Sequence, residues 1–168
     1  MEPSEYAKQI LKKQLQDCQR NDDGFSVGLV DDSDLFRWSV CFEGAPETLY
    51  EGGFFRAELA FPADYPNKPP EMKFLSEMWH PNIYPDGRVC ISILHDPGND
   101  DIALESADER WRPILGVEAV LHSVISMLND PNIESPANVD ASVQFRDDVD
   151  DYKKKVKKLV RKTLDCLQ

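Results

Sequence analysis

The first twenty residues alternate apolar and polar side chains with the period of an amphipathic helix. Ser4 stands just before this pattern, where its hydroxyl can accept a hydrogen bond from the first free backbone N–H groups, and Gly24 lies beyond its end. The pattern predicts one surface helix, whose apolar stripe consists of Ala7, Ile10, Leu11, Leu15 and Cys18.

The hydrophobic pattern then changes to one that is typical of strands. Four runs are rich in Val, Phe and Trp, and the turn-forming segments DDSD, EGAPE and PADYPNKPP separate them. These runs cover residues 25–30, 35–42, 53–61 and 71–75. Consecutive strands joined by such turns predict an antiparallel meander.

Residues 79–113 follow neither period, and a loop of this length in a small domain is usually functional. Beyond it the sequence predicts a strongly apolar helix, the turn NDPNIESP, a short helix near 139–145 and a final amphipathic helix. In the first of these helices the apolar positions are Val117, Val120, Leu121, Val124, Ile125 and Leu128. In the last helix the buried-face positions are Tyr152, Val156, Leu159, Val160 and Thr163. Strands followed by helices predict the α+β class, here as a single domain over residues 1–168.

The net charge of the chain limits the classes of partner to be expected. The 168 residues have a net charge of −12, and phosphate contacts need clustered Lys and Arg, so neither nucleic acid nor an anionic membrane surface is an expected partner. The basic run KKKVKKLVRK falls on the last predicted helix and is expected to be its solvated face. No apolar run could span a bilayer, no N-terminal signal pattern is visible, and no CxxC pair predicts a metal or disulfide. A cytosolic or nuclear protein with free thiols is expected.

Cys90 is the most promising functional residue, because it lies in the aperiodic region whereas Cys18, Cys41 and Cys166 fall in apolar patterns and are expected to be buried. A thiolate there could accept an acyl group. A hydrolase of the Cys–His type would also need an imidazole close by, and His80, His95 and His122 are the candidates, between which spacing does not choose. The amide of Asn82 could donate a hydrogen bond to an oxyanion, or it could form a turn.

The run HPNIYPDGRVCISILH, residues 80–95, resembles the active-site signature of ubiquitin-conjugating enzymes. Four further segments are similar to the family's segments in the same order, so that the resemblance covers essentially the whole chain: FPADYPNKPPEMKF, WHPNIY, ERWRPILGVEAVLHSVISMLNDPN and SPANVDAS. The stretch HDPGNDDIALESADERW resembles the acidic insertion of a subgroup that builds lysine-linked ubiquitin chains. Within that subgroup, HPNIYPDGRVC is most similar to the branch that serves endoplasmic-reticulum-associated degradation.

The resemblance implies the α+β ubiquitin-conjugating fold: an N-terminal helix, a four-stranded antiparallel meander, a central helix and two C-terminal helices. It also implies that Cys90 accepts ubiquitin as a thioester from the activating enzyme and, with a RING-type ligase, passes it to lysine. No cofactor is implied. The expected location is the cytoplasm, with the nucleus or recruitment to the cytosolic face of the endoplasmic reticulum as further options.

Further site residues follow from the same resemblance. Asn82 matches the asparagine credited with holding the oxyanion or the local loop, and His80 matches a structural histidine. Tyr84 and Ser135 are expected to support the site, although Ser135 stands where many members carry an Asp near the incoming lysine. The acidic loop, about 96–109, is expected either to attract the acceptor or simply to be solvated, and its carboxylates are Asp96, Asp100, Asp101, Glu105, Asp108 and Glu109.

Two predicted turns match the family's ligase-contacting loops, with Pro66 and Asn67 in the first and Trp111, Pro113 and Ile114 in the second. Asn67 replaces an aromatic or aliphatic residue of many relatives, which makes HECT-type ligases less suitable partners. Two alternatives to a conjugating enzyme stay open at this point: a non-catalytic scaffold of the same fold, and a Cys-dependent hydrolase.

Overall fold

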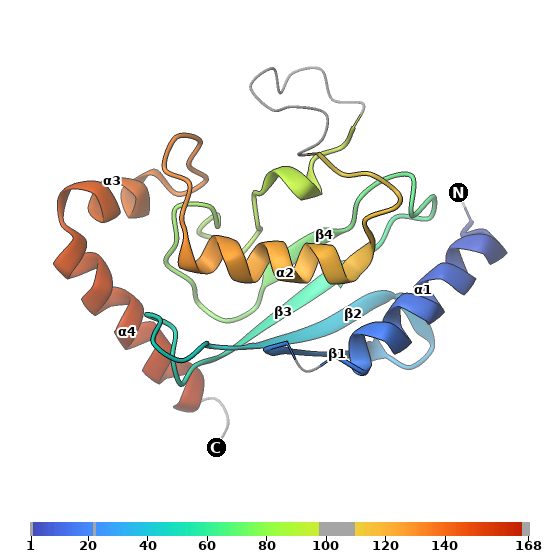
Figure 1. Cartoon of the computed structure of the whole chain (residues 1–168), viewed down its shortest axis with the longest axis horizontal. Helices are drawn as coiled ribbons and strands as arrows, with labels where there is room; N and C mark the ends of the chain where they lie inside the picture. Colours follow the sequence, from blue (N-terminus) through green and yellow to red (C-terminus); the bar gives the residue numbers. More distant parts are fainter. Residues whose placement is uncertain (1, 22, 98–109, 166–168) are drawn as a thin grey trace.

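The computed structural model describes residues 2–21, 23–97 and 110–165. Its elements, in chain order, are α1 (Glu5–Gln19), β1 (Phe25–Asp31), β2 (Asp34–Glu43), β3 (Phe54–Ala60), β4 (Glu71–Phe74), the 3₁₀ turn η1 (Ser92–Leu94), α2 (Gly116–Asn129), α3 (Val139–Asp147) and α4 (Val149–Asp165). The strands form one antiparallel sheet in the order β1-β2-β3-β4 (Figure 1). The predicted α+β meander is therefore confirmed, and the strand bounds agree within one or two residues.

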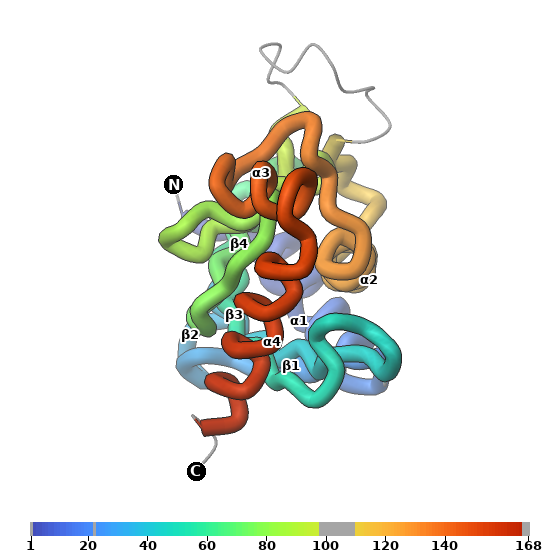
Figure 2. The backbone as a smooth tube through the Cα atoms, turned by 90° about the vertical axis from the view of Figure 1, so that its left-hand side faces the viewer, coloured from blue at the N-terminus to red at the C-terminus, as the bar shows by residue number. Residues whose placement is uncertain are grey.

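The helices lie around one face of the sheet. In Figure 1, α2 crosses in front of the strands, α1 lies near one end of the sheet, and α3 and α4 lie at the other. The side view shows α3 and α4 toward the viewer and α2 to one side of the strands (Figure 2). None of the described helices is long and apolar enough to cross a membrane.

Strand alternation separates the two faces of the sheet. Trp38, Val40 and Phe42 on β2 are at most 1% exposed and point into the core, as successive side chains of a strand point to opposite faces. Cys41, between two of these residues, therefore lies on the outer face and is partly exposed. The prediction that Cys41 is buried is wrong. Cys18 on α1 is buried as predicted, and Cys166 lies outside the described residues.

Aromatic side chains connect the sheet to two loops near its β3–β4 end. The rings of Trp38, Phe61, Tyr65 and Trp111 form a chain with centroids 4.9–5.7 Å apart. The indole N–H of Trp111 donates to the carbonyl of Pro66 at 2.8 Å, so the 66–67 turn and the 111–114 loop are held side by side. These are the two loops that the sequence assigned to ligase binding.

The segment without periodicity has local order of its own. Ile83 forms an isolated bridge with Val89, and Arg88 forms one with Lys73. After Cys90 and Ile91, η1 begins at Ser92. The final helix has the predicted amphipathic form, since Tyr152, Val156, Leu159, Val160 and Thr163 are buried while the lysines between them are exposed. Predictions that concern residues 98–109 lie outside the described residues.

Candidate active site

His80 anchors the segment that precedes Cys90. Its ring is fully buried; Nε2 lies 2.8 Å from the carbonyl oxygen of Met127 on α2, and Nδ1 accepts the backbone N–H of Asn82 at 2.9 Å. Burial lowers the pKa of His80 from 6.5 to about 4, so the ring is neutral at physiological pH and carries its proton on Nε2. Its burial and its two hydrogen bonds fit the structural role that the resemblance implied.

Asn82 joins three segments at the site. Its side-chain Nδ2 donates to the carbonyl of Asn132 at 2.8 Å, and its Oδ1 accepts the backbone N–H of Asn132 at 2.9 Å. Its own carbonyl accepts the backbone N–H of Cys90 at 2.9 Å. The side chain is only 3% exposed, yet Nδ2 has a second hydrogen and Asn82 lines the same cleft as Cys90.

A tight turn over residues 84–88 precedes Cys90, which is partly exposed. The carbonyl of Tyr84 accepts the N–H of Gly87 at 2.8 Å, and the guanidinium of Arg88 stacks on the Tyr84 ring at 4.6 Å. Gly87 has a φ of +102°, and a Cβ there would come within 2.2 Å of the Phe74 carbonyl oxygen. Only glycine fits this conformation and this close approach to β4. Tyr84 supports the turn without lining the larger cleft.

Cys90 lies where two clefts meet. The larger cleft, of about 770 Å³, is lined by Asn82, Cys90, His95 and Ser135 among others, and the smaller one, of about 530 Å³, shares Cys90 and His95 with it. Cys90 is partly exposed and lines both clefts. By contrast, burial together with Glu118 and Asp17 raises the pKa of Cys18 to about 12, so that thiol is unreactive.

The structure chooses among the three candidate imidazoles. His95 Nε2 lies 3.9 Å from Cys90 Sγ, whereas His80 is bound to α2 and His122 is paired with carboxylates. Residues 92–94 turn back through η1 and so bring His95 to the thiol five positions earlier. Spacing alone gave no sign of this, because the fold of a short aperiodic segment depends on what surrounds it.

Two carboxylates that the sequence analysis did not single out line the larger cleft. Asp130 and Glu134 are exposed there, in the turn after α2, together with the predicted Ser135. Asp96 lines a different cleft, beside Pro62 and Lys68. The other predicted loop carboxylates lie outside the described residues. The pairing of Asn82 with Asn132 is what brings this turn to Cys90, and a motif read along the chain does not reveal it.

The predicted ligase-binding residues divide into two groups. Pro66 and Trp111 are buried and contact each other, so they support the two loops and do not present side chains to a partner. That part of the prediction is corrected. Asn67, Pro113 and Ile114 are exposed, and Ile114 is 87% exposed, which is unusual for a large aliphatic side chain. These three residues form the accessible part of the predicted surface.

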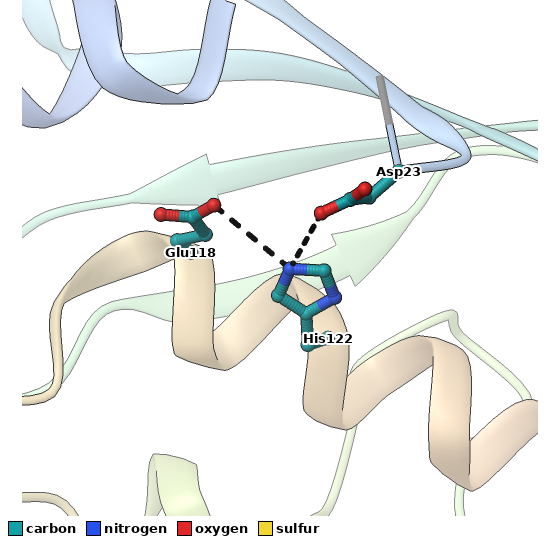
Figure 3. Close-up of side chains that lie close together, drawn as sticks. All are labelled: Asp23, Glu118 and His122. Carbon is teal, nitrogen blue, oxygen red and sulfur yellow. Dashed lines mark ion pairs between the residues drawn. The ribbon is translucent and has the colours of Figure 1, made fainter. Parts of the chain in front are cut away.

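One group of side chains away from Cys90 has the composition of a metal site. Asp23, Glu118 and His122 place their ligand atoms within 4.8 Å of one another at the surface (Figure 3). His122 Nε2 lies 3.3 Å from Asp23 Oδ2 and 4.0 Å from Glu118 Oε1. These close contacts connect α2 to the segment before β1.

Comparisons with known proteins identify one family. The family model described as "Ubiquitin-conjugating enzyme" matches residues 10–160. "Ubiquitin-conjugating enzyme E2 15" of Schizosaccharomyces pombe is 54% identical over 166 residues, which is 98% of this chain and 99% of that protein. "Probable ubiquitin-conjugating enzyme E2 7" of Caenorhabditis elegans is 59% identical over 160 residues, 95% and 98% of the two chains. "Ubiquitin-conjugating enzyme E2 7" of Arabidopsis thaliana is 57% identical over 158 residues, 94% and 95%.

The sheet, the four helices and the thiol in its cleft define an α+β enzyme of acyl-transfer type. With these matches, the chain belongs to the ubiquitin-conjugating enzyme family, whose members work with ubiquitin, an activating enzyme and ligases. The fold is the ubiquitin-conjugating fold that the sequence predicted.

Proposed function

We propose that Cys90 carries ubiquitin as a thioester and transfers it to a lysine held by a ligase. The position of Cys90 is the observation that supports this most directly. Its sulfur lies at the junction of two clefts, whereas Cys18 is in the core and Cys41 is on the outer face of the sheet. Asn82, with one amide hydrogen beyond its bond to Asn132, lies in the same cleft.

The reaction has two steps. The sulfur of Cys90 attacks the thioester carbonyl of ubiquitin on the activating enzyme, a new S–C bond forms, and the activating enzyme's thiol leaves. The neutral amine of a lysine then attacks the Cys90 thioester and expels the Cys90 sulfur. A thiol is a good leaving group, so deprotonating the amine is the harder requirement, and a nearby carboxylate can promote it. Glu134 and Asp130 are suitably placed in the cleft.

The finer assignment follows the sequence resemblance. The chain would build ubiquitin chains for proteasomal degradation, in the branch that serves the endoplasmic reticulum, with a RING-type ligase at Asn67, Pro113 and Ile114. It would act in the cytoplasm or nucleus, or at the cytosolic face of the endoplasmic reticulum through a partner. The acidic residues of the loop, about 96–109, would attract the acceptor or shield the thioester.

A charging assay tests the proposal. The chain is incubated with activating enzyme, ATP and ubiquitin and examined on a non-reducing gel. Wild type should form a thiol-labile adduct, Cys90→Ser an adduct that resists thiols because it is an oxyester, and Cys90→Ala none. Cys41→Ser is the matched control and should charge like wild type. Normal charging of Cys90→Ala would overturn the assignment, and an absence of any adduct would favour the scaffold alternative.

The contact between Cys90 and His95 gives the hydrolase alternative a specific observation in its favour. The same assay separates it from conjugation. A hydrolase would release free ubiquitin from the loaded chain at a rate that does not depend on added lysine. A conjugating enzyme should hold the thioester in water and release ubiquitin mainly when a ligase and an amine are supplied.

A further inference from the structure

His95 is the group closest to the reacting thiol whose role the two steps above leave unassigned. Its Nε2 lies 3.9 Å from Cys90 Sγ, and both residues line both clefts. This distance is long for a hydrogen bond, but catalytic contacts are often long before the substrate binds. The imidazole therefore lies close enough to exchange a proton with this sulfur.

The backbone fixes the position of His95. Its N–H donates to the carbonyl of Ser92 at 2.9 Å, and its carbonyl accepts the N–H of Trp111 at 3.1 Å. Trp111 is fully buried, so this second bond ties His95 to a rigid part of the core. Neither bond uses the imidazole. A substitution of the side chain keeps both of these backbone hydrogen bonds.

We propose that His95 is a catalytic residue that handles the proton of the Cys90 thiol, an inference that rests on the proposed thioester function. In charging, Nε2 accepts the proton of Sγ while the sulfur bonds to the ubiquitin carbonyl, and the imidazolium then protonates the thiolate that leaves the activating enzyme. In discharge, the ring accepts the proton that the attacking amine loses and returns it to the departing Cys90 sulfur. Each step conserves protons and needs no further reactant.

The expected size of the effect is limited. A free thiol is already a few per cent ionised near neutral pH, so a base that ensures full ionisation raises the amount of nucleophile by at most about thirty-fold. His95→Gln should therefore slow charging by roughly ten- to thirty-fold at pH 7. The deficit should shrink as pH rises, because hydroxide in solution increasingly replaces the imidazole as the base.

Other ionisable groups face the same space and must be controlled for. The larger cleft contributes Asp130 and Glu134 from the turn after α2, and the smaller one contributes Glu58, Glu71, Lys73, Tyr84 and Arg88 from the strands and the turn before Cys90. These groups are the same in wild type and in the variant. The ratio of the two rates at each pH therefore isolates the contribution of the imidazole.

The experiment measures single-turnover transfer of ubiquitin from preloaded activating enzyme to the full chain between pH 6.5 and 9. The variants are His95→Gln, His95→Ala and, as a matched control, His122→Gln, which removes an exposed histidine from α2. Unfolding temperatures confirm that each variant folds. His95→Ala is also measured with added free imidazole, which can occupy the space that the side chain vacates and act as the base.

A deficit in both His95 variants that shrinks as pH rises and is partly rescued by imidazole, with His122→Gln unchanged, is the expected result. Wild-type rates at all pH values, or a deficit that neither pH nor imidazole alters, would overturn the role of His95. If wild type itself forms no adduct on Cys90, the proposed function fails instead, so the two failures are distinguishable.

Discussion

At the level of single residues, Asn82 has a structural task and, by the sequence resemblance, a proposed catalytic one. Its side chain holds the backbone of Asn132 through two hydrogen bonds while one amide hydrogen is left for the cleft. Any substitution affects both tasks, so a loss of activity alone says little about the oxyanion. A control is needed that has the same cost in stability and leaves the cleft unchanged.

Asn138 provides that control. Its buried side chain accepts the N–H of Ala141 and caps α3, and removing such a cap costs about 1 kcal/mol. We expect Asn82→Ala and Asn138→Ala to lose comparable stability, about 1–3 kcal/mol. Both should charge, but only Asn82→Ala should discharge to lysine slowly, by roughly a hundred- to a thousand-fold if the amide binds the oxyanion. Equal single-turnover discharge in the two variants would leave Asn82 as a turn residue.

His80 gives the fold a distinct pH dependence. Burial lowers its pKa from 6.5 to about 4 in the folded chain. Below pH 6.5 the unfolded chain binds a proton that the folded chain does not, so stability is full above this pH and falls as pH drops toward 4. The loss should reach about 3 kcal/mol. Urea unfolding should show this slope in wild type and not in His80→Gln, and identical slopes would contradict the assignment.

At the level of elements, periodic segments were predictable and side-chain placement was not. Among the described residues, the period-3.6 and period-2 patterns located each α-helix and strand within a few residues, though not η1, because each such element buries one face. Cys41 was misplaced because Val40, Cys41 and Phe42 are all apolar, so composition hides which of them points outward. The resemblance placed Trp111 in a contact loop, but the indole faces Pro66 inside the molecule.

Ile114 and Trp111 test how the two loops divide recognition and support. Ile114 is 87% exposed and Trp111 is 0% exposed. Ile114→Ala should change stability by no more than about 0.5 kcal/mol and slow ligase-stimulated discharge roughly ten-fold, as truncation of an interface anchor costs about 1–2 kcal/mol. Trp111→Ala should instead lose about 3–5 kcal/mol of stability.

Leu75→Ala is the matched surface control, since Leu75 is 50% exposed and lies after β4. Discharge is measured with and without a RING-type ligase. A ligase response that is unchanged in Ile114→Ala, or reduced equally in Leu75→Ala, would contradict a docking surface at residues 113–114.

At the scale of the whole molecule, the site is assembled from distant parts of the chain. Cys90 and His95 come from one aperiodic segment, Asn132 and Glu134 from the turn after α2, and the core connects them. The sequence identified Cys90 and Asn82 through a local motif. It did not identify His95 as the partner of Cys90, or Glu134 as a cleft residue, because those positions depend on tertiary packing.

The charge of the molecule leads to a prediction about salt. The acidic insertion includes Asp100, Asp101, Glu105 and Asp108 in a chain of net charge −12. Changing these four residues to their amides should slow ubiquitin-chain synthesis and leave charging nearly intact if they attract a basic acceptor or ligase. Such attraction is screened over about 8 Å at physiological salt, so the advantage of wild type should shrink as ionic strength rises.

A second variant with the same change in charge is the control, with amides at Glu2, Asp32, Glu47 and Asp165. It should behave like wild type. A salt-independent deficit in the first variant would argue against steering, and faster loss of ubiquitin to water would indicate that the acidic segment shields the thioester.

The conformation of Gly87 limits which amino acids its position can accept. A side chain there would meet the Phe74 carbonyl 2.2 Å from its Cβ, in a backbone conformation that only glycine adopts readily. Gly28 on β1, by contrast, has no atom within 4 Å of such a Cβ. In a saturation library selected for ubiquitin transfer, position 28 should therefore accept many amino acids. Position 87 should return glycine alone, although its side chain takes no part in the reaction.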